Sequence, residues 1–92
     1  MLITVHYTTQ LKAALGVGRE QLDLDPPIHL NDVLGALHER HGATFADLVY
    51  AGDGRLLPSI LLCLGDNQIE ASYADPLEDG DVLTLLSAIS GG

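Results

Sequence analysis

One amphipathic helix, predicted over residues 31–41, most constrains how this chain can fold, because it stands among short apolar runs. Asp32 lies near the positive end of the helix dipole and Arg40 near its negative end, which favours these bounds. The residues that share its apolar face at helical spacing are Leu30, Val33, Leu34, Leu37 and His41. Because such a face must be buried against another layer, the remaining runs are expected to supply a sheet.

Alternation of side chains and short apolar runs predict about five strands for that sheet. They cover residues 2–8, 19–24, 60–64, 68–71 and 82–86. Two shorter helical segments are predicted, one over residues 10–15 with Thr8 or Thr9 as its cap and Gly16 at its end, and one over residues 44–50. The element order predicts an α+β protein with a mixed sheet packed on one main helix, and residues 1–92 form a single domain.

The termini and the cysteine usage bear on where the protein works. No stretch approaches the ~20 apolar residues that a transmembrane helix needs, and no secretory signal precedes the first strand. The single cysteine, Cys63, cannot form an internal disulfide, which fits a reducing compartment. We therefore expect a cytoplasmic protein.

The charge is strongly negative, at −9, from thirteen acidic and four basic residues. Such a surface repels phosphate backbones and anionic lipids, so neither nucleic acid nor a membrane is expected as a partner. No basic residue follows Arg55, whereas six acidic residues do. This acidic half is either simply a solvated surface or a surface that attracts a basic partner.

The side chains give little support for an enzyme. Cys63 lies within an apolar run, where a thiol is typically a small buried hydrophobe. His38 and His41 are three residues apart on the main helix, but no Cys or carboxylate pattern with metal-site spacing accompanies them. The chain also has no phosphate-binding GxxxxGK[ST] loop. We expect a non-catalytic chain that binds neither a metal nor a cofactor.

The candidate reactive group is at the end of the sequence, where Gly91 and Gly92 follow the last strand and a short stalk. Glycine lacks Cβ, so a flexible Gly-Gly tail (residues 87–92 with its stalk) can enter a channel that is too narrow for other residues. The alternative is a frayed end without a role.

The motif before this tail resembles a known family. Leu77–Leu83 reads LEDGDVL, and the Gly-Gly pair ends nine residues later, at Gly92. This combination is similar to the C-terminal signature of the MoaD/ThiS family of ubiquitin-like sulfur carriers, with the small subunit of molybdopterin synthase as the most similar member. The resemblance implies a β-grasp fold for the whole chain, although its specific residues are those from 77 to 92. Ser87-Ala88 stands where these tails often carry proline.

The resemblance implies a function for the terminal carboxylate. A partner of the ubiquitin-activating type would adenylate Gly92 with ATP and Mg²⁺, and sulfur would replace AMP to give a thiocarboxylate. Gly91 would give the tail access to the partner's active site. The sulfur would pass to an accepting enzyme such as the large subunit of molybdopterin synthase. Sulfur carriage for thiamine-thiazole, cysteine or other thio-metabolite synthesis is the alternative within the family.

Two alternatives belong to other classes. The chain would be a protein modifier if Gly92 were joined to lysines of target proteins, or a plain interaction domain if the tail had no role. Partner docking is predicted for Leu86 and Ile89, within an apolar strip that includes Leu62 or Leu64, and for the acidic pair Asp79 and Asp81. The two aspartates are equally compatible with a structural role in the turn around Gly80.

Overall fold

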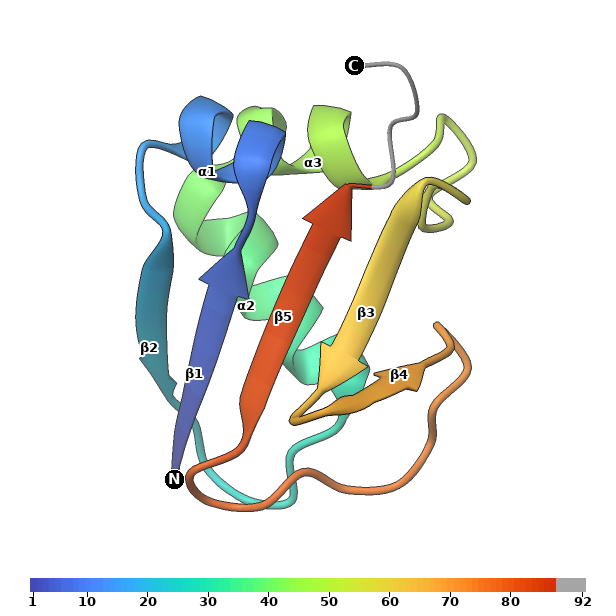
Figure 1. Cartoon of the computed structure of the whole chain (residues 1–92). Helices are drawn as coiled ribbons and strands as arrows, with labels where there is room; N and C mark the ends of the chain where they lie inside the picture. Colours follow the sequence, from blue (N-terminus) through green and yellow to red (C-terminus); the bar gives the residue numbers. More distant parts are fainter. Residues whose placement is uncertain (88–92) are drawn as a thin grey trace.

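The computed structural model describes residues 1–87, which form one five-stranded sheet with helices behind it (Figure 1). The elements, in chain order, are β1 (Leu2–Tyr7), α1 (Thr9–Leu15), β2 (Arg19–Asp23), α2 (Leu30–His41), α3 (Ala43–Val49), β3 (Ile60–Leu64), β4 (Asn67–Ile69) and β5 (Val82–Ser87). The predicted α+β class and mixed sheet are confirmed. No helix in this described part is both long and apolar enough to cross a membrane.

The last strand occupies the centre of the sheet, whose order is β2-β1-β5-β3-β4. β5 runs parallel to β1, with Val5 opposite Leu83, and antiparallel to β3, with Leu62 opposite Leu85. The outer pairs, β1–β2 and β3–β4, are antiparallel. This order places the beginning of the chain and the end of the described chain in neighbouring strands, and it holds β5 by hydrogen bonds on both sides.

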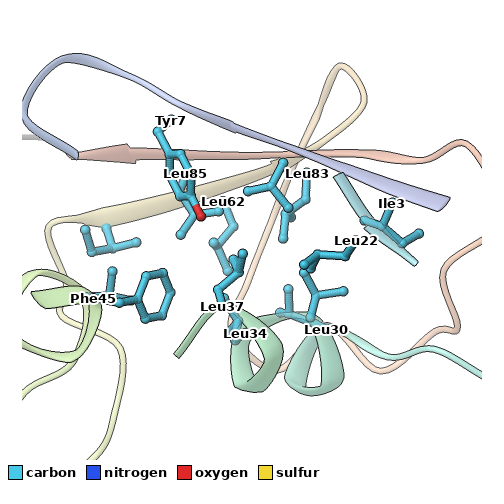
Figure 2. Close-up of a cluster of buried hydrophobic side chains, with 14 of the residues drawn as sticks. Ile3, Tyr7, Leu22, Leu30, Leu34, Leu37, Phe45, Leu62, Leu83 and Leu85 are labelled. Atoms are coloured by element: carbon cyan, nitrogen blue, oxygen red, sulfur yellow. The ribbon is translucent and has the colours of Figure 1, made fainter. Parts of the chain in front are cut away.

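The core lies between the sheet and the helices (Figure 2). Leu83 and Leu85 of β5 are fully buried and point toward α2 and α3, where Leu37 and Phe45 are also fully buried. Alternate residues of a strand face opposite sides, so the inward set of β5 leaves Val82, Thr84 and Leu86 on the other face. A core with two aromatic rings, those of Tyr7 and Phe45, and many aliphatic side chains matches the composition of the chain.

The ends of the helices can be compared with the capping residues that the sequence predicts. Gly16 ends α1 with φ +76°, as predicted, because a left-handed residue suits glycine. Thr8, one of the two predicted cap residues, occupies the N-cap of α1, but its side chain makes no capping hydrogen bond. At the start of α2, the Asp32 carboxylate accepts a hydrogen bond from the His29 backbone N–H at 2.8 Å.

Candidate functional site

The described chain ends at the rim of the sheet from which the tail continues. Ser87 closes β5 opposite Ile60, and Tyr7 ends the neighbouring β1 two positions earlier in the register. Figure 1 shows that α1 and α3 border this same end of the sheet. The predicted reactive residues Gly91 and Gly92, and the predicted docking residue Ile89, lie outside the described residues. Their roles stay predictions.

The sheet has an open face, which is the face turned away from α2. It carries Thr4, His6, Leu61, Cys63, Val82, Thr84 and Leu86, and within residues 1–87 no helix packs on it (Figure 1). Thr84 is paired with His6 on one side and with Cys63 on the other, while Leu86 is paired with Leu61 nearer the tail. Leu86 is therefore the last apolar side chain of β5 on this face, and it is half-buried.

Two predictions about this face are wrong. Leu62 is buried in the core opposite Leu85, so it is not part of the predicted exposed strip, and Leu64 lies on the same inward side opposite Leu83. The outward partners of the strip are instead Leu61 and Cys63. Cys63 is half-buried on the open face rather than buried among apolar side chains.

Asp79 and Asp81 hold the turn that precedes β5. An Asp79 carboxylate oxygen accepts a hydrogen bond from the Leu2 backbone N–H at 2.6 Å, and Asp81 accepts one from the Glu78 backbone N–H at 2.8 Å. Gly80 between them has φ +89°, which disfavours a side chain. The structural role of the two aspartates is thus observed. The turn lies at the start of β5, and Ser87 ends this strand about 17 Å further on, at ~3.3 Å per residue.

A buried carboxylate near the end of the sheet where β1 and β5 finish was not predicted from the sequence. The Glu20 side chain, only 8% exposed, accepts hydrogen bonds from the Tyr7 hydroxyl and from Arg40 Nη1, at 2.6 and 2.8 Å. Its Oε2 also lies 2.6 Å from His41 Nε2. His41 in turn contacts the Tyr7 ring edge-on and stacks on Phe45. This Glu20 cluster ties β1, β2 and α2 together.

The surroundings change the ionisation of the Glu20 cluster. Burial alone would raise the pKa of Glu20, but the hydrogen bonds from Tyr7, His41 and Arg40 outweigh it and hold the pKa below its usual range. Burial and the hydrogen bond to Glu20 raise the pKa of Tyr7 far above that of a free phenol. The cluster therefore contains an ionised Glu20 carboxylate and a neutral Tyr7 phenol, whose hydrogen bond links β1 to β2.

The described residues offer no centre for metal chemistry. Among residues 1–87, no group of three His, Cys, Asp or Glu side chains could hold a metal ion. Each buried polar side-chain atom in this range has a hydrogen-bond partner.

Comparisons with known proteins agree with this geometry. No protein-family model matches the chain, and a search of the curated proteins finds no match. Among solved structures, it is similar to SAMP1 from Haloferax volcanii, with 23% identity, full coverage of both chains and a TM-score of 0.86. The chain has the fold of the MoaD/ThiS ubiquitin-like family. The predicted β-grasp fold is thereby confirmed for residues 1–87.

Two further structures with this fold contain partner proteins. One is a complex of subunits 1 and 2 of molybdopterin-converting factor from Helicobacter pylori, with 21% identity, full coverage of both chains and a TM-score of 0.66. The other is the BexX/CysO complex of Amycolatopsis orientalis, with 25% identity, 98% and 99% coverage and a TM-score of 0.69. Proteins of this ubiquitin-like fold thus occur in complexes with other proteins.

Proposed function

We propose that the chain is a sulfur carrier whose Gly92 carboxylate becomes a thiocarboxylate, most directly for molybdopterin biosynthesis. The observation that carries this proposal is the coincidence of a ubiquitin-like fold with a central last strand that leads, within five residues, to Gly-Gly. Similarity to subunit 1 of molybdopterin-converting factor supports the pathway. Similarity to CysO supports a carrier for another thio-metabolite as the alternative within the same chemistry.

The chemistry needs activation because a carboxylate has no good leaving group. An oxygen of the Gly92 carboxylate attacks the α-phosphorus of ATP on a partner enzyme, and pyrophosphate leaves. Hydrosulfide then attacks the acyl carbon, the bond from that carbon to AMP breaks with its electron pair, and the thiocarboxylate remains on Gly92 after the sulfur proton passes to solvent. The chain itself contributes the carboxylate and its presentation, while the adenylating partner supplies the ATP and Mg²⁺ site.

Partner docking belongs on the open face beside the tail. Leu86 and Leu61 lie across from each other near the end of β5, and a partner that covers them is well placed to receive the tail. We extend this patch to Ile89 on the basis of the sequence. Asp79 and Asp81 are already engaged with backbone N–H groups at the other end of β5, so we assign them to the turn.

The decisive test is the intact mass of the chain after co-expression with an adenylating enzyme and a sulfur donor. The expected product has one oxygen of the terminus replaced by sulfur, and fragmentation locates the change at Gly92. A mass that stays unchanged while the same enzyme and donor convert a known carrier would contradict the proposal.

Leu86→Gln tests the docking patch. We expect adenylation to fall about tenfold, since a central apolar contact commonly contributes more than 1 kcal/mol to binding. Leu2→Gln is the matched control, because Leu2 is exposed and faces the same side at the far end of β1. The measurement is ATP-pyrophosphate exchange against carrier concentration. Equal losses of adenylation in Leu86→Gln and Leu2→Gln would show that the apolar patch near the end of β5 has no special role in docking.

A protein modifier is the second candidate. Similarity over the whole chain to small archaeal modifier protein 1 supports it. Both candidates share the activated Gly92 and differ in the nucleophile that attacks it, sulfur or a lysine amine. Lysine conjugates in cell extracts that disappear when Gly92 is deleted are the expected sign of the modifier.

A further inference from the structure

We propose that the chain can be joined to a second copy of itself at one position only, through an amide between Gly92 of one copy and Lys12 of the other. This inference rests on the activated Gly92 of the proposed function. It would yield an unbranched chain of copies with a single type of linkage.

The composition makes Lys12 unique. The four basic residues of the sequence are Lys12, Arg19, Arg40 and Arg55, so Lys12 is the one side chain with an amine. The other amine, at Met1, donates a hydrogen bond to the Leu24 carbonyl at 2.8 Å and lies 3.3 Å from Asp23 Oδ1. That group is engaged at the end of β2, whereas Lys12 is exposed on α1.

The surroundings of Lys12 leave its amine accessible. Within residues 1–87, no carboxylate lies at ion-pair distance from it, although the chain is strongly acidic. Its aliphatic stem lies across Gly18, where an added Cβ would be 3.0 Å from Cε and 3.1 Å from Cδ. The Lys12 stem can therefore lie there because Gly18 has no side chain.

The hollow beside Lys12 suits an extended Gly-Gly segment. It has a volume of about 380 Å³ and is lined by Thr9, Lys12, Ala13, Gly16, Val17 and Gly18. These side chains are mostly small or absent, so a backbone without side chains can come close to the amine. A tail that ends in Gly91-Gly92 has this property.

Charge favours another copy as the occupant. Residues 1–22 carry Lys12 and Arg19 against the single acid Glu20, which is a net charge of +1 in a chain of −9. Glu20 is moreover buried and bonded to Tyr7 and Arg40. A second copy, which is acidic, is therefore repelled least by the surface around α1 and the start of β2.

The bond-forming step is an aminolysis. The unprotonated Nζ of Lys12 attacks the Gly92 carbonyl carbon of a second copy that is held as its acyl-adenylate. The C–N bond forms, the bond from the carbonyl carbon to AMP breaks with its electron pair, and the amine proton passes to a solvent base. ATP, used by the adenylating partner, supplies the energy.

The experiment incubates the full chain with an adenylating enzyme and ATP-Mg²⁺, without a sulfur donor, and records intact mass. The expected product has twice the chain mass less one water, with the branch mapped to Lys12 by fragmentation. Lys12→Arg should abolish it while ATP-pyrophosphate exchange stays unchanged. Exchange without any conjugate would overturn this inference and leave the proposed function standing, whereas the absence of exchange would count against the proposed function.

Two variants test position. Lys12→Arg combined with Arg55→Lys moves the single side-chain amine to position 55, where the wild-type side chain is 88% exposed. We expect at least about tenfold less conjugate there, because nothing at that position orients the amine toward the tail. Gly18→Ala should also lower the yield by crowding the Lys12 stem. Full yield from the relocated lysine, or a cyclised single copy in place of the pair, would overturn the role of the hollow.

Discussion

A chain that ends at Gly91 is expected to lose adenylation and thiocarboxylate formation completely, and to unfold at the same temperature as the full chain. The reactive carboxylate would then sit one residue short of the partner's nucleotide, a shift of about 3.3–3.6 Å along an extended chain. Misplacement of this size destroys catalytic alignment. The described core is built from residues between Ile3 and Leu85, so removal of position 92 does not reach it.

Mass spectrometry after co-expression and a thermal melt together check this expectation. Gly92→Ala is the matched variant, because it keeps the length and the carboxylate but adds one methyl group at the terminus. We expect it to retain part of the activity if the channel is tolerant and none if it is tight. A truncated chain with full activity would exclude every function that works through Gly92 and leave the plain interaction domain.

The sequence predicted the fold well where the signal is local. The 3.6-residue period of α2 and the alternation in β1 are properties of short windows, and both elements appear close to the predicted bounds. The run Ile60–Leu64 is apolar at every position, so it contains no alternation to say which side faces in. The sequence therefore offers Leu62 or Leu64 for the exposed strip, although the register places them opposite Leu85 and Leu83 on the inward side.

The Glu20 cluster could not be read from the sequence for a different reason. Tyr7, Glu20 and His41 come from β1, β2 and α2, and they meet only when the hairpin register and the helix position are both known. The candidate site has a similar limit. The Gly-Gly motif is visible in the sequence, but only the pairing of β3 with β5 shows that Leu61, and not Leu62, lies across from Leu86 on the open face.

Glu20→Ala is expected to destabilise the fold by about 3 kcal/mol at pH 7, which is the largest stability loss predicted for a single polar residue here. The substitution leaves the Tyr7 hydroxyl, the half-exposed Arg40 and His41 without their shared acceptor at a position that is 8% exposed. Urea unfolding measures the loss. Glu20→Gln keeps the shape and one acceptor, so a smaller loss of about 1–2 kcal/mol is expected for it. Losses below about 0.5 kcal/mol for both variants would show that the cluster is no more than a surface ion pair.

The pH dependence of the same variants separates the charge of Glu20 from its packing. Because the folded pKa of Glu20 is lowered, its contribution is present above the unfolded pKa of about 4.3 and is lost as the pH falls through the folded value. The advantage of the wild type over Glu20→Gln should therefore shrink below about pH 4. Because the folded pKa of Tyr7 is raised, its contribution is present below the unfolded pKa of about 10 and is lost above it, and Tyr7→Phe should flatten that alkaline decline. A wild-type advantage over Glu20→Gln that is constant from acid to neutral pH would mean that Glu20 stabilises the fold by hydrogen bonds that do not depend on its ionisation.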